Sequence, residues 1–447
     1  MVHHQGEPGR SLRVGVVGAG IAGLCAAYEL SRAGAEVVVW ETRPEPGGQV
    51  ATFTLGGQRL EGFYHHIFRS DQDFIGLIED LGLDSDLSWG PSRVGFFYQG
   101  KIYPFTTPWD LLRFAPLGLG DRLRLGLLSL RLRWTASGEA LEDVTAQEWL
   151  KEKAGPRAYR VIWEPLLRGK FGDRAPEIGM AWLWSKMRLR FGSRSPGMGR
   201  EVLGYLAGSF GRVVDRLVDR IEKQGGRLVT STPVREIRVK DGAVAGVMAG
   251  DSFQPCQAVI ATVPLDIFRK LVGGLPPDFG GGVSYLAALV LVLVLRRPLT
   301  PVYWLNIADP QVPFVALVEH ANFVPPETYG GKRVVYVSNY LPREDPLYSL
   351  DKEALLDGYW PALKLIAPDL ERGWIEECHL FREDYAQPVI TTGYSQRIPP
   401  HRTPVRGLYL ANTAQVYPED RGMNYSARMG KAVARMVQED WQEKGGP

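Results

Sequence analysis

The chain has 447 residues, of which 45% are hydrophobic and 23% charged, and its formal net charge is +2. This composition is typical of a globular protein long enough for about two or three domain-sized units, and it excludes a disordered or fibrous chain. A net charge so close to zero gives no support for binding to nucleic acid.

The cysteines and the apolar runs indicate in which cellular compartment the protein is expected. The three cysteines are far apart and odd in number, which predicts a reducing, cytoplasmic environment without a disulfide framework or a zinc site. Residues 1–11 are polar and lack the apolar core of a secretory signal, so we expect a disordered lead-in. The most apolar run, 283–295, is shorter than the ~20 residues of a membrane-spanning helix. Its β-branched residues predict a buried strand instead.

Residues 14–48 read as one supersecondary unit. An apolar strand at 14–17 is followed by a glycine-rich turn, an alanine-rich helix and a second strand at 37–40. Glu41 closes this second strand, ~20 residues beyond the glycines, where an acid accepts hydrogen bonds from ribose hydroxyls and repels a 2′-phosphate. The segment therefore predicts a dinucleotide-binding βαβ unit that disfavours NADP.

Each residue of the turn has a separate role in such a unit. Gly18 permits the tight turn, Gly20 lets the backbone approach a pyrophosphate, and Gly23 lets the helix pack close to the sheet. The N–H groups of the first helical residues, Ile21 and Ala22, would donate to that pyrophosphate, aided by the helix dipole.

The residues after Glu41 carry a family resemblance. The run Glu41-Thr-Arg43-Pro-Glu-Pro-Gly47-Gly48 resembles the E-x-R-x-x-x-G-G extension of FAD enzymes in the flavin amine oxidase, protoporphyrinogen oxidase and phytoene desaturase superfamily. The resemblance implies FAD rather than NAD as cofactor. It also implies that Arg43, Gly47 and Gly48 belong to the binding site.

Two later stretches resemble further FAD-binding segments of this superfamily. In a strand of the T-P-V-R-E-I type, Val234 is implied to contact the flavin nucleotide through its backbone. Near the carboxyl end, a strand at 407–412, a loop and a helix resemble the motif whose helix points at the isoalloxazine, which implies roles for Asn412 and Asn424. Asn412 stands where an acid is usual, which argues against amine oxidation. No cysteine lies there, so we expect non-covalent FAD.

The resemblance implies an α/β fold. It is a Rossmann-like FAD-binding domain of the GR2 type with an inserted α+β substrate domain. The FAD-binding domain would comprise residues 12–87, 204–264 and 401–447. The substrate domain would comprise residues 88–203 and 265–400.

Residues 121–134 alternate leucine and arginine. Wound as a helix, they place apolar side chains on two opposite faces with arginines in the seams between. Two apolar faces predict a helix sandwiched inside a domain, whereas a helix on a membrane surface has one. The basic seams would also suit anionic headgroups, so peripheral membrane contact is left open. The two faces are Leu123, Leu127, Leu130, Trp134 and Leu125, Leu128, Leu132.

A following segment mixes aromatic and basic residues. The aromatic residues could wall a substrate pocket while the cations bind an acidic group; the alternative is a helical core with solvated cations. The residues concerned are Trp163, Trp182, Trp184, Arg168, Lys170, Arg188 and Arg190.

Several polar residues in apolar surroundings are the catalytic candidates. Asn306, Glu319, His320 and Asn322 form either a satisfied network or a ligand site, because buried polar groups need partners. We expect a pocket over the flavin, lined on one side by His66, Glu319 and His320 and on another by Asn306, Asn322 and Arg421. The substrate would be a small molecule, anionic or polyol. The pair His65 and His66 has no further ligands for a metal.

The leading function is an FAD-dependent oxidoreductase (oxidase, dehydrogenase or desaturase) that transfers a hydride from substrate to flavin. The alternative is a flavin-dependent sugar-nucleotide mutase, because the run from Tyr64 to Phe68 resembles the histidine-containing loop of UDP-galactopyranose mutase. A flavin-binding protein without catalysis is the third reading.

Overall fold

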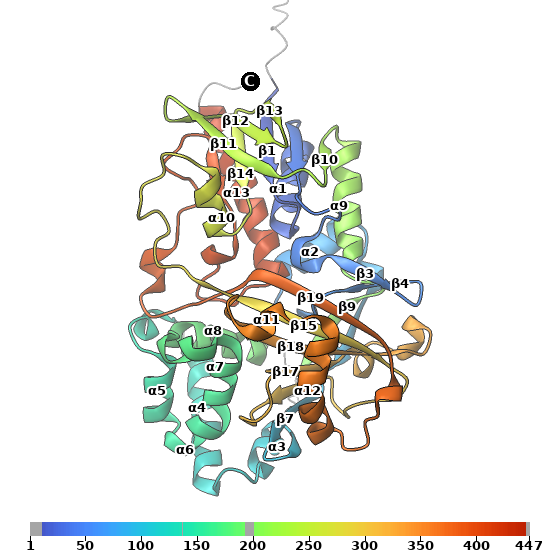
Figure 1. Ribbon diagram of the computed structural model, residues 1–447. Helices are drawn as coiled ribbons and strands as arrows, with labels where there is room; N and C mark the ends of the chain where they lie inside the picture. The colour runs from blue at the N-terminus through green and yellow to red at the C-terminus, as the bar shows by residue number, and fades with distance from the viewer. Residues whose placement is uncertain (1–10, 136, 193–200, 444–447) are drawn as a thin grey trace, which may run out of the picture.

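The computed structural model describes residues 11–135, 137–192 and 201–443, so most of the predicted lead-in lies outside the described residues. Figure 1 shows two parts stacked on one another. The first and last described elements lie in the upper part, and a large sheet and a group of helices form the lower part.

In the described part of the chain, five parallel strands form the sheet of the upper part. The predicted βαβ unit is confirmed as its centre, with helix α1 (Ile21–Arg32) between two neighbouring strands. The strands come from three separate stretches of the chain, in agreement with a discontinuous nucleotide-binding unit. In sheet order they are β10 (Arg227–Val229), β2 (Glu36–Trp40), β1 (Arg13–Val17), β14 (Ala258–Ala261) and β20 (Leu408–Leu410).

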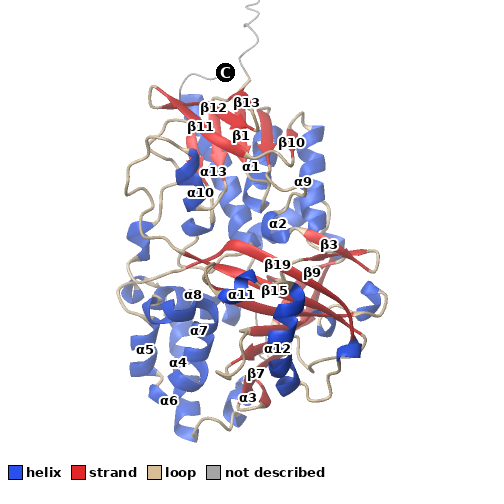
Figure 2. Cartoon of the chain, viewed as in Figure 1, coloured by secondary structure: helices blue, strands red, loops and turns tan. Residues whose placement is uncertain are grey.

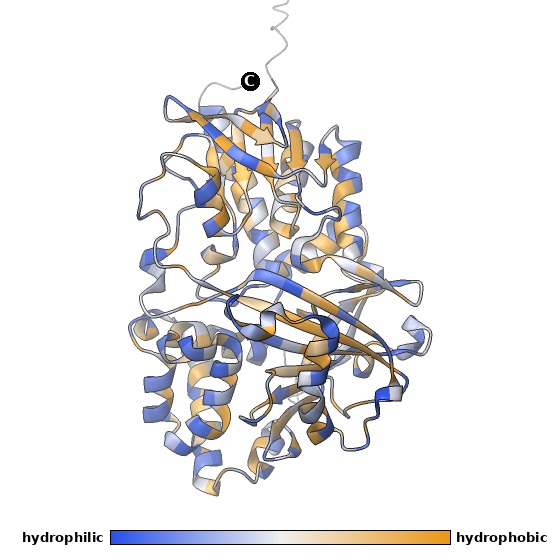
Figure 3. Cartoon of the chain, in the orientation of Figure 1, coloured by the Kyte–Doolittle hydropathy of each residue, from blue (hydrophilic) through white to orange (hydrophobic). Residues whose placement is uncertain are grey.

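Both faces of this sheet are covered, which is why its strands are largely apolar (Figure 3). Val14 and Val16 pack on one side against α1 and the other helices of that face, while Val17 and Trp40 pack on the opposite side. The first face carries α9 (Gly211–Lys223), α13 (Met423–Glu443) and α2 (Gln72–Asp80). The second carries β11 (Val234–Lys240), β12 (Ala243–Ala249), β13 (Ser252–Pro255) and α10 (Leu265–Leu271).

Within the described residues, the lower part contains a seven-stranded sheet. Its strand β15 (Tyr285–Leu295) confirms the strand predicted from the most apolar run, and its residues after Tyr285 are buried. Helix α12 (Lys352–Ile366), preceded by α11 (Pro346–Ser349), packs on one face. In order the strands are β19 (Ile375–Pro388), β15, β18 (Arg333–Leu341), β17 (Ala316–Glu319), β16 (Trp304–Ile307), β7 (Val94–Tyr98) and β8 (Lys101–Pro104).

Smaller sheets lie between the two parts. The hairpin of β3 (Thr52–Leu55) and β4 (Gln58–Glu61) turns at Gly56 and Gly57, which both have positive φ. Strands β5 (Ile67–Phe68), β9 (Val202–Leu206) and β6 (Leu87–Pro91) pair in a further sheet. The domain boundaries proposed after residue 87 and before residue 204 fall inside β6 and β9, so this sheet joins the two parts.

The remaining helices of the lower part lie at its left in Figure 2, except α3, which lies at the bottom of the molecule. They are α3 (Pro108–Arg113), α4 (Leu119–Trp134), α5 (Ala146–Lys153), α6 (Pro156–Ala158), a π-helical turn (Tyr159–Trp163), α7 (Glu164–Phe171) and α8 (Met180–Gly192). Within the described ranges, no helix has both the length and the apolarity needed to cross a membrane.

Helix α4 corrects one prediction. The helix forms where expected, but it is not sandwiched. Leu125, Leu128 and Leu132 are buried, whereas Leu123, Leu127, Leu130 and Trp134 on the opposite face are exposed. The physical reason is that the contacting helices α3, α6 and α8 leave the opposite side of α4 uncovered.

Candidate active site

The glycine turn forms a cradle beside the amino end of α1. Gly18 has φ +103°, and a Cβ there would lie 2.6 Å from the Thr262 hydroxyl oxygen. A Cβ at Gly20 would meet no protein atom within 4 Å, so the protein leaves this side open. Gly20 is also the N-cap of α1 and has no side chain to occupy the free N–H groups of Ile21 and its neighbours. An open cradle with unoccupied donors fits a pyrophosphate.

The residues of the E-x-R-x-x-x-G-G run gather around this turn. The Glu41 carboxylate accepts hydrogen bonds from the backbone N–H groups of Ala19 and Arg43, both at 2.9 Å. The Gly47 N–H donates to the Ala19 carbonyl at 2.8 Å, and Gly48 lies against Gly20. Arg43 forms an ion pair with Glu383 at 2.8 Å. This geometry supports the predicted nucleotide site, with Glu41 holding lone pairs for a ribose as well as for the turn.

The other predicted cofactor residues lie in three separate elements of the structure. Val234 is the first residue of β11. The Asn412 side chain donates to the Val263 carbonyl and accepts from the Ala414 N–H, so it caps a short helical turn. Asn424, in the first turn of α13, accepts from the Phe74 N–H at 3.1 Å and is buried. Their roles toward FAD stay predictions.

A charged cluster lies at the loop that precedes α13. Asp420 forms ion pairs with Lys170 of α7 at 2.9 Å and with Lys186 of α8 at 2.5 Å. Only 12%, 16% and 29% of these three side chains, in that order, is exposed to solvent. Both ammonium groups also lie over the ring of Trp182. We call Lys170, Lys186, Asp420 and the adjacent Arg421 the cationic cluster.

Arg421 connects this cluster to the nucleotide site. Its guanidinium donates to Gln49 at 3.1 Å, to Gln387 at 3.2 Å and to the Tyr340 hydroxyl at 2.8 Å. Gln49 directly follows Gly47 and Gly48, while Tyr340 and Gln387 belong to the seven-stranded sheet. The cationic cluster therefore borders both the cofactor region and the lower part of the molecule.

The cluster carries an excess of positive charge. Burial lowers the pKa of Lys170, although Asp420 acts to raise it. Burial likewise lowers the pKa of Lys186, to about 8. Burial alone would raise the pKa of Asp420, but Lys170 and Lys186 hold it well below its usual range. Three cations thus face one carboxylate, and Glu383, which also acts on Arg421, is already paired with Arg43.

The paired histidines lie nearby and are neutral. Burial, followed by the charge of Arg190, lowers the pKa of His66 to about 3, and its Nδ1 is 3.0 Å from the Tyr303 hydroxyl. Burial lowers the pKa of His65 to about 4, and its Nδ1 donates to the Phe63 carbonyl at 2.7 Å. The charge of Lys186 also lowers the pKa of His66, so His66 lies near the cationic cluster.

Glu319 and His320 make their hydrogen bonds elsewhere. Glu319 accepts from the N–H groups of Leu299 and Thr300 and from the Thr300 hydroxyl. The Nε2 of buried His320 lies 3.1 Å from the Tyr329 hydroxyl.

The two asparagines proposed for the pocket also bond within the protein. Asn306 accepts from the Trp304 indole, and Asn322 donates to two backbone carbonyls. Asn306, Glu319 and Asn322 are therefore satisfied within the protein, whereas the buried Nδ1 of His320 has no hydrogen-bond partner among the described residues. The catalytic roles of Glu319 and His320 stay predictions.

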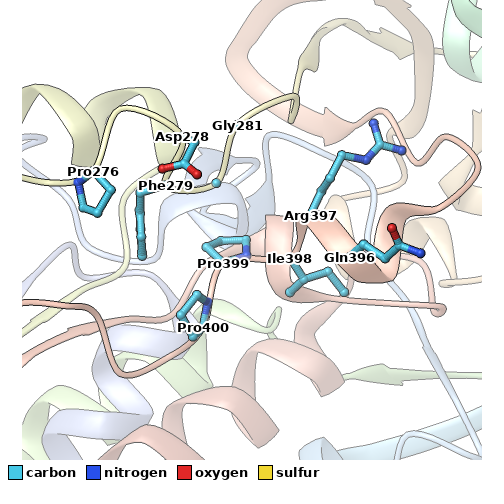
Figure 4. Close-up of a pocket in the computed structure, with 10 residues that line it drawn as sticks. Pro276, Asp278, Phe279, Gly281, Gln396, Arg397, Ile398, Pro399 and Pro400 are labelled. Carbon is cyan, nitrogen blue, oxygen red and sulfur yellow. The ribbon is translucent and has the colours of Figure 1, made fainter.

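Two of the cavities among the described residues differ in whether predicted site residues line them. The larger, of about 1000 Å³, is lined by Asn424 and Tyr425 at the start of α13 and by Trp184 of α8, among others. The smaller, of about 290 Å³, lies between the loop at 276–281 and residues 396–400 (Figure 4). None of the predicted site residues lines the smaller cavity, so the larger one is the candidate route to the cofactor.

Sequence reasoning missed most of the residues that surround Arg421. Lys186, Asp420, Gln49, Gln387 and Tyr340 come from five separate segments, and nothing in their spacing brings them together. The only local signal is that Asp420 adjoins Arg421 and that Lys186 follows Trp182 by one helical turn.

Fold and site together define a dinucleotide-dependent enzyme with a second part built over the cofactor. The family model described as flavin containing amine oxidoreductase matches residues 21–437. The chain therefore belongs to the flavin-containing amine oxidoreductase family.

Individual relatives agree with this family. The chain is 23% identical over 470 residues to the 15-cis-phytoene desaturase of Narcissus pseudonarcissus, covering 98% of this chain and 81% of that protein. A solved structure described as a putative protoporphyrinogen oxidase from Exiguobacterium sp. 255-15 superposes with a TM-score of 0.77 at 19% identity, covering 96% and 99% of the two chains. Reduced UDP-galactopyranose mutase superposes with a TM-score of 0.74 at 15% identity, covering 96% of each chain, which shows a shared fold.

These findings confirm the principal expectations from the sequence. The chain is an FAD-dependent oxidoreductase that acts on a small molecule, which sets aside the reading of a flavin-binding protein without catalysis. The mutase is not favoured over oxidation, since its similarity is one of fold.

Proposed function

We propose that the protein oxidises an anionic small molecule, whose acidic group binds at the cationic cluster beside the flavin. The observation that carries this proposal is the cluster itself: Lys170, Lys186 and Arg421 face the single carboxylate of Asp420 in a largely buried site. Buried charges without partners are costly, so an anionic ligand would stabilise this arrangement.

The surroundings of the cluster support a substrate with a flat apolar body. Lys170 lies over both Trp182 and Tyr340, and Arg421 lies over Tyr340 as well. Tyr64 adds another ring, because its hydroxyl lies 3.4 Å from that of Tyr340. Aromatic walls with a few convergent polar groups are typical of small-molecule sites.

The roles of the residues follow from these contacts. FAD, when bound, supplies the two-electron acceptor. Arg421 and the two lysines would orient the acidic group, and the aromatic rings would exclude water from the reacting bond. The neutral His66, with a pKa of about 3, is a poor base, so Lys186 is the better candidate to accept a proton at alkaline pH.

The test compares an anionic with a neutral probe. FAD-loaded protein is titrated with benzoate and with benzamide, and binding is followed by the change in flavin absorbance. We expect benzoate to bind about tenfold or more tightly than benzamide, and Lys186→Gln to remove this preference. Arg168→Gln is the matched control, because Arg168 lies on the same helix as Lys170 and is mostly exposed. Equal affinities for the two probes in the wild type would overturn the proposal.

A second measurement separates oxidation from mutase chemistry. Aromatic acids that bind are mixed anaerobically with the protein, and the flavin should bleach and then recover in air. If activity instead required prior reduction and converted a sugar nucleotide without net oxidation, the mutase alternative would be correct.

A further inference from the structure

His65 lies in the loop between β4 and β5, beside the cationic cluster. The hydroxyl of the preceding residue, Tyr64, is 3.4 Å from the hydroxyl of Tyr340 in β18. Arg421 donates to this Tyr340 hydroxyl at 2.8 Å. The charge of Arg421 acts on both Tyr64 and His65, so the His65 ring lies close to the guanidinium group.

The geometry of His65 determines which ring nitrogen carries the proton. Its Nδ1 lies 2.7 Å from the Phe63 carbonyl oxygen, which can only accept a hydrogen bond, so Nδ1 must carry a hydrogen. Burial lowers the pKa of His65 to about 4, so the ring is neutral and has no second proton. Its Nε2 therefore presents a lone pair. His66 differs, because its Nδ1 faces the Tyr303 hydroxyl, which can donate or accept.

The lone pair of His65 is free to accept a hydrogen bond. Among the described residues, its Nε2 has no hydrogen-bond partner, and it does not belong to the buried atoms that lack one, so it retains accessible surface. Other acceptors near Arg421 are engaged. The amide oxygens of Gln49 and Gln387 accept from Arg421. The carboxylate of Asp420 pairs with the two lysines of the cationic cluster.

We propose that His65 is a specificity-determining residue whose Nε2 accepts a hydrogen bond from a hydroxyl group beside the acidic group of the substrate. This role rests on the proposed function, because Arg421 and the two lysines hold the acidic group. An aromatic 2-hydroxy acid has the required combination, since its hydroxyl is on the carbon next to the carboxylate. A 2-amino acid fits less well, because the three cations would repel its ammonium group.

The test compares three probes that share one carbon skeleton and bind to the FAD-loaded protein. They are 2-hydroxy-2-phenylpropanoate, 2-phenylpropanoate and the neutral 2-phenylpropanamide. The hydroxy acid has no hydrogen on its hydroxyl-bearing carbon and so cannot be oxidised there, which leaves binding as the only event. Titrations are followed by flavin absorbance. We expect 2-phenylpropanoate to bind more tightly than its amide, and the hydroxy acid to bind about fivefold more tightly still, as one additional hydrogen bond predicts.

Variants of His65 assign this preference to one atom. His65→Phe keeps a ring but removes the acceptor, so it should weaken binding of the hydroxy acid by about fivefold and leave binding of 2-phenylpropanoate unchanged. His65→Gln supplies an amide oxygen and should restore part of the preference. His379→Phe is the matched control, because the Nε2 of His379 pairs with Glu377 and lies in β19. It should keep the wild-type preference.

Two results would overturn the role of His65. One is equal affinity of the wild type for the two acids when both bind more tightly than the amide. The other is an equal loss of affinity for both acids in His65→Phe, which would show that the ring only supports the loop. Equal binding of 2-phenylpropanoate and its amide would instead overturn the proposed function, and the role of His65 with it.

Discussion

The three glycines of the nucleotide turn differ in what surrounds them. Gly18 needs its positive φ, and a Cβ at Gly23 would lie 2.1 Å from the Gly18 carbonyl oxygen. Gly20 has φ −75° and no protein atom near its missing side chain. Gly18 and Gly23 are therefore required by the protein itself, whereas the need for glycine at position 20 arises only when a ligand is present.

This difference predicts distinct effects of two substitutions. Gly20→Val should leave the apoprotein folded but lower its affinity for FAD by at least about tenfold, because the side chain enters the pyrophosphate cradle. Gly23→Ala should instead destabilise the apoprotein by about 1–3 kcal/mol through overpacking. FAD retention on gel filtration and thermal unfolding of the apoprotein measure the two effects. Full FAD occupancy in Gly20→Val would exclude this turn as the pyrophosphate site.

Lys186 makes anion binding depend on pH. Its pKa is lowered by burial to about 8, so the side chain is charged below this pH and becomes neutral as the pH rises through it. Losing one charge-assisted hydrogen bond costs about 1.5–3 kcal/mol, which corresponds to about tenfold or more in affinity. We therefore expect the dissociation constant of benzoate to increase between about pH 7 and pH 9. A profile for Lys186→Gln that still rises over this interval would show that another group titrates.

Among the elements, the contact between α1 and α13 shows how the ends of the chain shape the cofactor site. A Cβ at Gly430 of α13 would lie 2.4 Å from the Ala22 carbonyl oxygen and 2.8 Å from the Cys25 Cβ. Ala22 belongs to the first turn of α1, beside the glycine cradle. The close approach of these helices thus depends on a glycine more than 400 positions away in the sequence.

Gly430→Ala should separate the two helices. Alanine is favoured over glycine in a helix by about 0.5–1 kcal/mol, but overpacking costs about 1–3 kcal/mol, so we expect a lower melting temperature and weaker FAD retention. Gly358→Ala in α12 is the matched control, because its Cβ would meet no atom within 4 Å. Calorimetry of both variants provides the comparison, and a rise in melting temperature for Gly430→Ala would show that the helices tolerate the extra methyl group.

At the scale of the whole molecule, the chain passes between the two parts several times. The nucleotide sheet takes strands from near residues 15, 40, 230, 260 and 410, and the seven-stranded sheet takes its strands from between them. The cationic cluster forms where these passages meet, with α7 and α8 on one side and the loop before α13 on the other. The charge and the geometry of this site therefore exist only in the folded chain.

Local sequence determined the nucleotide-binding unit. The strand, glycine turn, helix and Glu41 are contiguous, so their geometry follows from short-range sterics and hydrogen bonding, and the structure agrees with the prediction. The apolar run that becomes β15 was predicted for the same reason, because length and β-branching are local properties.

Tertiary structure decided the surroundings of the site and of α4. Periodicity identifies the two apolar faces of α4, but only its neighbours determine that one face is buried and the other exposed. Similarly, polarity alone could not distinguish Glu319, which is satisfied by the backbone of residues 299 and 300, from Arg421, which lies in a cluster with excess positive charge. The physical reason is that burial and charge balance depend on residues brought together from distant parts of the chain.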